Sequence, residues 1–171
     1  YNMPYLYMLY ILTNIAIPKL LAIKLLSILF DIALAVSIFL VVKHFKPKSY
    51  TPYFAGVASL FVPTILFNSA LWGQCDAIFT SFIVLSFWAI LKDKRLLIWV
   101  FWGIAFSFKL QAIFFLPILA YSWFLTPNKN LTSYIIPLSA LGVFIASIIP
   151  AMVIGRPLDS LLSIYAGQTS G

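Results

Sequence analysis

The chain has 171 residues, of which 63% are hydrophobic and only 9% are charged, and its mean hydropathy is +1.05. This apolar content is too high for a soluble domain with one buried core, so most of it must face lipid. The net charge of +7 does not indicate nucleic-acid binding, because the basic residues are scattered between apolar stretches. A single cysteine, Cys75, excludes an intrachain disulfide and a cysteine-based metal site.

The apolar stretches predict an all-α polytopic bundle, a single transmembrane domain with about five to six membrane segments. A tyrosine-rich segment at 4–17 suits the membrane interface, and an outer segment follows at 155–171. The chain begins at Tyr1 without an initiator methionine, so we interpret it as an internal fragment of a longer protein. The predicted spans are residues 20–42, 53–67, 71–91, 96–108, 110–125 and 131–154.

The basic linkers orient these spans. Residues 43–48, 92–95 and 126–130 together hold seven of the eleven Lys and Arg residues, which places these linkers in the cytoplasm by the positive-inside rule. The stretch 96–125 has two interpretations, because Lys109 lies near its middle. It is either one helix with a lysine at membrane depth or a hairpin that turns at Lys109. We prefer the hairpin, since it keeps Lys129 on the cytoplasmic side.

With this topology, unusual polar residues gather at the extracytoplasmic end. Between Asp76 and Lys92 there is room for only ~22 Å of helix against a hydrocarbon core of ~30 Å, so Asp76 lies below the outer surface. Polar groups in lipid are costly unless they line a cavity or pair with one another. We therefore expect a site at this end. Its candidate residues are Asn68, Trp72, Gln74, Asp76, Lys109, Gln111, Arg156, Asp159 and Gln168.

These residue types suit a sugar and a phosphate. A carboxylate such as Asp76 can orient a hydroxyl, act as a general base or help to hold a metal, or it can simply pair with Lys109 at the top of a helix. Trp72 and Gln74 suit sugar or headgroup recognition, although Trp72 also fits an interfacial anchor. Lys109 and Arg156 are the cations available for a phosphate, and their alternative role is to reach toward lipid headgroups.

One more carboxylate lies inside an apolar span. Asp31 follows Lys24 by seven residues, about two helical turns, so the two side chains share one face of their helix. We interpret them first as polar contacts between helices and second as part of the site.

The chain resembles the bacterial relatives of the second GPI mannosyltransferase, which belong to the GT-C superfamily of membrane glycosyltransferases. The resemblance covers roughly residues 1 to 168, and its most specific feature pairs W-G-Q-x-D with a later K-x-Q-A-x-x-x-x-P. The stretches that carry it are YLY, KLLSILFDIALA, LFVPTILFNSALWGQCDAIFTSF, GIAFSFKLQAIFFLP and GRPLDSLLSIYAGQ.

This resemblance implies an enzyme that moves a sugar, mannose or another hexose, from a polyprenyl-phosphate carrier to a glycolipid, glycan or protein acceptor at the extracytoplasmic face. It implies a bacterial plasma membrane, or an ER membrane in a eukaryote. The family's catalytic acid would precede Tyr1, so the fragment alone should be inactive and Asp76 should position substrate. Metal dependence, sugar and acceptor stay open. The matching positions are Trp72, Gln74, Asp76, Lys109 and Gln111, with Arg156, Asp159 and Gln168 in a less distinctive segment.

Two other functional classes compete with this interpretation. A transporter or a flippase of a lipid-linked sugar should have polar residues along a path across the bilayer, whereas here nearly all lie at one face. Asp31 and Lys24 are the residues that hint at a deeper path. A non-enzymatic membrane scaffold would not need Gln74, Asp76 and Lys109 at one boundary.

Overall fold

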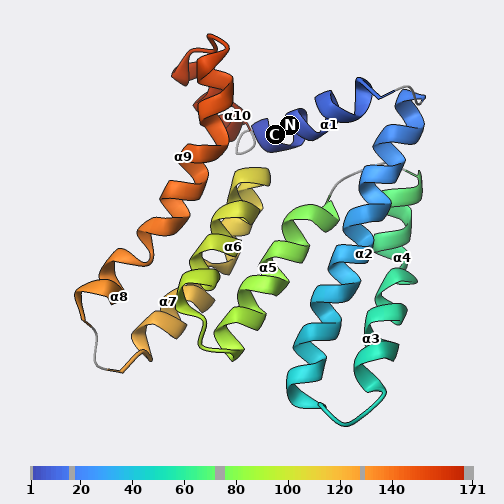
Figure 1. The fold of residues 1–171 in the computed structure, drawn as a ribbon, viewed down its shortest axis with the longest axis vertical. Coiled ribbons are helices and arrows are strands. Elements are labelled where there is room, and N and C mark those ends of the chain that lie inside the picture. The colour runs from blue at the N-terminus through green and yellow to red at the C-terminus, as the bar shows by residue number, and fades with distance from the viewer. Residues whose placement is uncertain (1, 16–17, 72–75, 128–129, 168–171) are drawn as a thin grey trace.

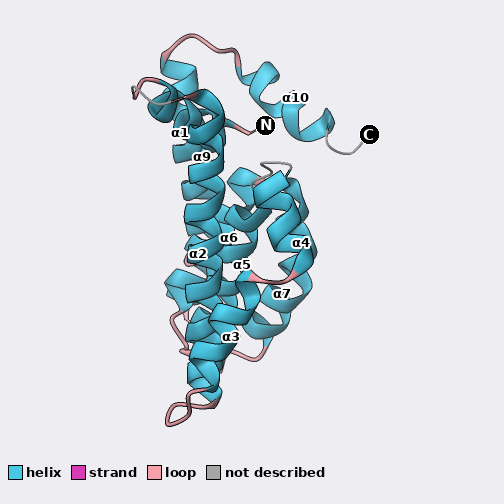
Figure 2. Cartoon of the chain, turned by 90° about the vertical axis from the view of Figure 1, so that its right-hand side faces the viewer, coloured by secondary structure: helices cyan, strands magenta, loops and turns pink. Residues whose placement is uncertain are grey.

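The computed structural model describes residues 2–15, 18–71, 76–127 and 130–167, and this part of the chain is built of helices joined by loops, without strands (Figures 1 and 2). Two of the elements are not α-helical, since η1 is a π-helical turn and η2 is a 3₁₀ segment. The elements in chain order are α1 (Met3–Thr13), α2 (Lys19–Phe45), α3 (Thr51–Leu60), α4 (Pro63–Leu66), η1 (Phe67–Leu71), α5 (Asp76–Leu91), α6 (Arg95–Phe108), η2 (Leu110–Phe115), α7 (Leu116–Phe124), α8 (Leu131–Ile135), α9 (Leu138–Val153) and α10 (Leu158–Gly167).

Among the described residues, two helical stretches are long and apolar enough to cross a membrane. They are α2, with 27 residues, and Leu131–Val153, with 23 residues, which joins α8 to α9. A third candidate is α3 followed by Pro63–Ser69, a pair that bends by 44°. Pro63 begins the second part, and a proline at that place cannot continue the hydrogen-bond ladder of α3. The remaining apolar helices, α1, α5, α6 and Leu110–Phe124, are shorter.

Residues 96–125 form two helical segments that run in opposite directions. Lys109 has an extended backbone with φ −153° and ψ 131°, which ends α6. Beyond it, the chain folds back, because the Trp102 indole N–H donates to the Ala112 carbonyl at 2.9 Å and Ile98 packs in one cluster with Leu119. Lys109 therefore lies at the tip of this reversal.

Small residues bring the helices close together. A Cβ added to Gly103 of α6 would lie 2.8 Å from the Ala140 Cα of α9, and one added to Gly56 of α3 would lie 3.0 Å from the Ala35 carbonyl oxygen of α2. Such close backbone approach is the usual way that helices pack in lipid, where burial of apolar surface gives little driving force. Large apolar side chains, including Phe54, Phe114 and Val153, are exposed on the outside, as a lipid-facing surface requires.

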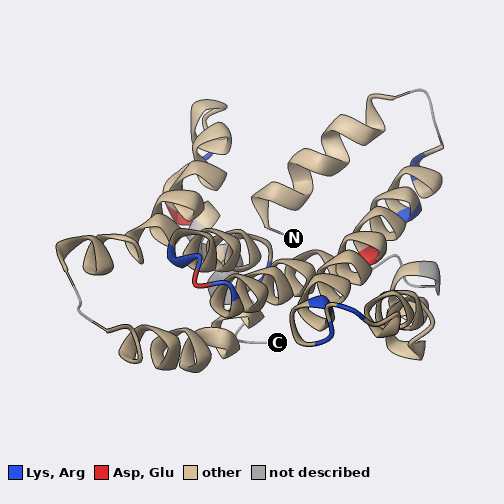
Figure 3. Ribbon diagram, turned by 60° about the horizontal axis from the view of Figure 1, so that its bottom comes forward, with Lys and Arg blue, Asp and Glu red and all other residues tan. Residues whose placement is uncertain are grey.

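Basic residues gather in two turns at one end of the molecule. Lys43, Lys46 and Lys48 lie at the α2–α3 turn, and Lys92, Lys94 and Arg95 lie at the α5–α6 turn. Figure 3 shows these basic residues in the connecting turns, and Figure 1 shows both turns at the same end of the molecule. α5 begins and α6 ends at the opposite end, where the candidate site lies.

Candidate functional site

Asp76 is the first residue of α5, and it forms an ion pair with Lys109. A carboxylate at this position is favoured, because the unpaired N–H groups of a helix N-terminus carry partial positive charge. The pair joins the Lys109 Nζ to the Asp76 Oδ1, and each side chain is 32% exposed. The fold thus brings together two half-buried charges that are 33 positions apart in the sequence.

Asn68 supports the other oxygen of this carboxylate. Its Nδ2 lies 3.5 Å from the Asp76 Oδ2, a long hydrogen bond, while the Thr80 hydroxyl donates to the Asp76 backbone carbonyl at 2.7 Å. Asn68 belongs to the π-helical turn η1, and π-helical turns interrupt the regular ladder and are frequent at functional sites. Asp76 is therefore contacted from its own helix, from η1 and from the tip of the α6–η2 reversal.

Aromatic residues position Lys109. The Lys109 Nζ lies 5.3 Å from the centre of the Phe79 ring, within the range of a cation–π contact. Its neighbour Phe108 stacks on Phe82 with ring centres 6.3 Å apart, and both belong to the cluster around the buried Tyr5 of α1. These contacts anchor the end of α6, so the Lys109 side chain is directed toward α5.

A cavity of ≈ 310 Å³ lies beside the ion pair, between α2, the α4–η1 segment and α5. Two carboxylates from different helices line it, Asp31 and Asp76. The other lining residues are Leu34, Thr64, Ile65, Asn68, Ala77 and Thr80. One wall of the cavity is polar and formed by short side chains, which leaves room for a ligand that carries several hydroxyl groups.

Asp31 is 9% exposed, the most buried carboxylate of the described residues. The Ser69 hydroxyl lies near this carboxylate but donates to the Ile65 carbonyl at 3.0 Å, and the Asp31 Oδ1 has no hydrogen-bond partner within the described part of the chain. A buried carboxylate oxygen without a partner is costly, and a group of this kind marks a functional site more often than a stabilising one. A ligand hydroxyl that reaches Asp31 would remove this cost.

The electrostatics of the site follow from these contacts. Lys109 compensates the charge of Asp76, whereas no Lys or Arg side chain is paired with Asp31 in the residues that the structure describes. The cavity therefore suits hydrogen-bond donors, while an anion would be drawn to Lys109 at its margin. The described residues contain no group of three or more His, Cys, Asp or Glu that could hold a metal ion.

The structure brings together only some of the residues that the sequence predicts. Asp76 and Lys109 form the ion pair, and Gln111 follows in η2 with an exposed side chain. Arg156 and Asp159 are exposed near the α9–α10 connection and do not line the cavity. Three further predicted residues, Trp72, Gln74 and Gln168, lie outside the described residues.

The sequence led us to interpret Asp31 first as a contact between helices and only second as part of the site, whereas in the structure it lines the cavity. Two signals pointed to the cavity. A carboxylate inside an apolar span is a functional candidate by default. In addition, Thr64 and Asn68, like Asp76 and Thr80, are spaced by four residues, which puts each pair on one helical face. The meeting of these faces depends on how three helices pack, and no local pattern encodes that.

No model of a known protein family matches the chain. Comparisons with curated proteins and with solved structures also found no match.

Proposed function

We propose that the protein is a membrane glycosyltransferase of the GT-C type, which moves a hexose from a polyprenyl-phosphate carrier to an acceptor at the extracytoplasmic face. The observation that supports this proposal most is the Asp76–Lys109 ion pair at the margin of a cavity that holds a second carboxylate, Asp31, which has no ion-pair partner among the described residues. A sugar phosphate needs both kinds of group, a cation for the phosphate and hydrogen-bond acceptors for the hydroxyls.

The reaction assigns a role to each group. The acceptor oxygen attacks the anomeric carbon of the sugar, the bond from that carbon to the phosphate oxygen breaks, and its electron pair stays on the phosphate. Lys109 stabilises the negative charge that develops on this leaving group, and a half-buried position strengthens the effect. Asp76 orients Lys109, while Asp31 and Asn68 accept hydrogen bonds from sugar hydroxyls in the cavity. The proton of the acceptor passes to a catalytic carboxylate, which we do not assign.

The membrane arrangement belongs to the same proposal. In a GT-C bundle of about five to six segments, the short helices α5, α6 and α7 would cross only part of the bilayer and expose the site below the outer surface. The basic turns would face the cytoplasm of a bacterial plasma membrane by the positive-inside rule. Apolar grooves between the helices would hold the prenyl chain.

The test uses native membranes that contain the full-length protein and a radiolabelled polyprenyl-phosphate mannose. Wild type is compared with Asp76→Asn, Lys109→Met and the matched control Lys92→Met, which removes a lysine charge from the turn at the other end of α5. Transfer of label to an acceptor is expected in wild type and in Lys92→Met. A loss of roughly 10²–10³-fold is expected in Lys109→Met, the usual effect of removing one group that stabilises developing charge. Equal rates in Lys109→Met and wild type would contradict the phosphate role.

One observation also favours a flippase of a lipid-linked sugar. Asp31 lies twelve residues after the start of α2, or ~18 Å along the helix, so the cavity reaches the depth of the span. A polar group at that depth suits a path across the bilayer. The same membranes distinguish the two functions. Movement of intact labelled carrier across the bilayer, with no transfer of sugar, would favour the flippase and reject the enzyme.

A further inference from the structure

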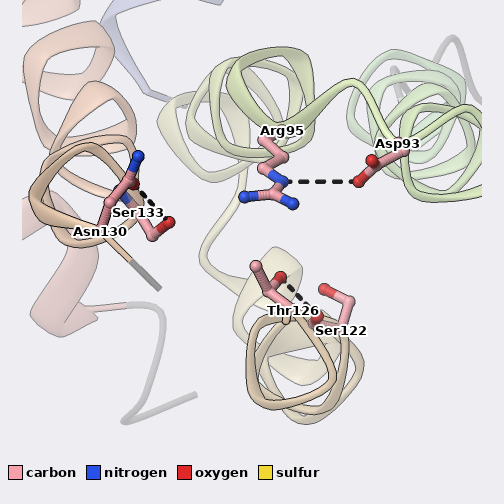
Figure 4. Close-up of polar contacts among 6 residues, drawn as sticks. All are labelled: Asp93, Arg95, Ser122, Thr126, Asn130 and Ser133. Atoms are coloured by element: carbon pink, nitrogen blue, oxygen red, sulfur yellow. Dashed lines mark hydrogen bonds and ion pairs between the residues drawn. The ribbon is translucent and has the colours of Figure 1, made fainter. Parts of the chain in front are cut away.

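The opposite end of the molecule holds a second cavity, which is independent of the function proposed above. It has a volume of ≈ 70 Å³ and lies where the α5–α6 turn meets α7 and α8. Its polar lining is formed by Asp93, Arg95, Ser122, Thr126 and Ser133 (Figure 4). Its apolar lining is formed by Ile90, Ile98, Trp99, Trp123 and Ile136.

The guanidinium of Arg95 has N–H groups that can donate hydrogen bonds to a ligand in this cavity. Its Nε lies 3.5 Å from the Asp93 Oδ1, and the Asp93 side chain is 82% exposed, so the pair is loose and well solvated. Within the described part of the chain, the two terminal nitrogens of the guanidinium have no hydrogen-bond partner. Figure 4 shows the guanidinium between the turn, the α7 hydroxyls of Ser122 and Thr126, and Ser133 of α8. Two parallel N–H donors of this kind fit a phosphate in a bidentate manner.

Among the described residues, the hydroxyl groups around Arg95 make only local hydrogen bonds. Ser122 donates to the Leu119 carbonyl at 2.8 Å and Thr126 to the Ser122 carbonyl at 3.2 Å, both within one turn of helix. Ser133 donates to the Asn130 Oδ1 at 3.0 Å, in the cap of α8. A hydroxyl can rotate away from such a bond to donate to a ligand. The volume exceeds the ~10–15 Å³ that a single water requires, and it accommodates a tetrahedral phosphate.

We propose that this cavity binds the phosphate of an anionic lipid headgroup. The lining beyond the polar wall is aromatic and aliphatic, and Trp99 and Trp123 are side chains typical of the membrane–water boundary. Phe124 and Leu125 at the end of α7 are exposed next to it, where the acyl chains of a lipid would lie. Lys92 and Lys94 are exposed in the same turn and add to the attraction for anionic lipid. A soluble phosphate would gain nothing from the apolar surface.

The experiment is native mass spectrometry of the purified protein in detergent, incubated with equal amounts of phosphatidylglycerol and phosphatidylcholine that carry the same acyl chains. Wild type is expected to retain phosphatidylglycerol in preference. Arg95→Gln should lower this retention roughly tenfold, because hydrogen bonds between charged groups are lost. Lys94→Gln is the matched control, since it removes the same charge from the same turn but from a residue outside the lining, and it should change retention much less.

Two further variants keep the test decisive if Arg95→Gln folds poorly. Arg95→Lys keeps the charge but not the fork of donors, so retention should fall by a smaller factor than in Arg95→Gln. Asp93→Asn removes the competing carboxylate, so retention should rise. Equal losses of phosphatidylglycerol retention in Lys94→Gln and Arg95→Gln would mean that the lipid is held by net positive charge rather than by a specific site, and would overturn the proposal.

Inorganic phosphate distinguishes the two sources of the anion. It is expected to displace phosphatidylglycerol only at a concentration far above that of the lipid, because it lacks the apolar contacts. Displacement at a concentration equal to that of the lipid would identify a site for soluble phosphate and overturn the lipid assignment. Equal retention of phosphatidylglycerol and phosphatidylcholine would also overturn it.

Discussion

The two ends of the molecule each carry one aspartate paired with one basic residue, and the two pairs are built differently. Asp76 and Lys109 are 32% exposed each, and they belong to separate helices. Asp93 and Arg95 lie two positions apart in one turn, and the Asp93 side chain is 82% exposed. The first pair depends on the tertiary fold, whereas the second forms wherever the turn forms.

This difference suggests how each pair is used. Water screens the Asp93–Arg95 attraction, so the pair contributes about 0–1 kcal/mol and Arg95 is free to exchange its partner for a ligand. The Asp76–Lys109 pair is more shielded, and its two residues hold each other in one orientation beside the cavity. A fixed pair suits the positioning of reacting groups, while a loose pair suits reversible binding at a surface.

Exchanging the charges of the Asp76–Lys109 pair should have the largest effect. Asp76→Lys combined with Lys109→Asp keeps an ion pair but moves the cation to α5, away from the place where the leaving phosphate would lie. We expect the folded protein to be recovered at a moderately lower yield, because a lysine is less favourable than an aspartate at the N-terminus of α5, while transfer of labelled mannose falls roughly 10²–10³-fold. Size-exclusion profiles and transfer rates in membranes measure the two quantities separately. Recovery of both would mean that the pair is only structural.

Gly103 fixes the position of α6 and therefore of Lys109 at its end. In Gly103→Ala, the new Cβ would meet the Ala140 backbone at 2.8 Å, so α6 and α9 must move apart. We expect a loss of about 1–3 kcal/mol in the free energy of unfolding, as for other overpacked sites. Gly142→Ala on α9 is the matched control, because a Cβ there meets nothing within 4 Å. Its stability should equal or exceed that of wild type, since alanine favours a helix.

These unfolding measurements compare the two glycine variants in the same detergent, by the temperature at which each loses its helical signal. The Gly103→Ala variant should also lose transfer activity, because Lys109 moves with α6. A Gly103→Ala variant as stable as Gly142→Ala would contradict the close approach of α6 and α9.

Asp31 should show opposite effects on activity and on stability. Asp31→Asn removes a buried negative charge whose Oδ1 has no partner in the described residues, so the protein should become about 1 kcal/mol more stable. Transfer should fall roughly tenfold, because the amide accepts a hydrogen bond from a sugar hydroxyl less strongly. Thermal unfolding and initial transfer rates provide the two values. If Asp31→Asn were less stable than wild type and equally active, the carboxylate would be a structural contact between helices.

The sequence predicts more of the fold than of the site. Apolar stretches and basic linkers predict helices in a membrane, and the described residues are helical with two or three candidate spans. The pairing of Asp76 with Lys109 was one of the alternatives that the sequence left open, because both residues lie at the same predicted face of the membrane. The place of Asp31 in the cavity was only the second interpretation, since it depends on the π-helical turn at Phe67–Leu71 and on the packing of α2 against α5. The periodicity of residue types along the sequence shows which side chains share one face of a helix, but it does not show which other helix packs against that face.

The α5–α6 turn allows the smallest and most local prediction. Asp93 has φ 50°, and the Lys94 N–H donates to the Ala89 carbonyl while the Asp93 N–H donates to the Ile90 carbonyl. This is the hydrogen-bond pattern of a Schellman cap, whose left-handed residue is usually glycine. Asp93→Gly should relieve the strain but lose the weak pair with Arg95, so stability should change by less than ~0.5 kcal/mol.

Asp93→Ala separates these two contributions, because it also removes the carboxylate but keeps a Cβ at the left-handed position. It should be about 1 kcal/mol less stable than Asp93→Gly, measured by thermal unfolding of both variants under the same conditions. Equal stability of the two would mean that the backbone at this turn carries no strain, and any effect of Asp93 would then come from its charge. If glycine can replace Asp93 at little cost in stability, this turn is organised for binding rather than for stability. The same turn holds Arg95, whose two terminal nitrogens have no hydrogen-bond partner among the described residues.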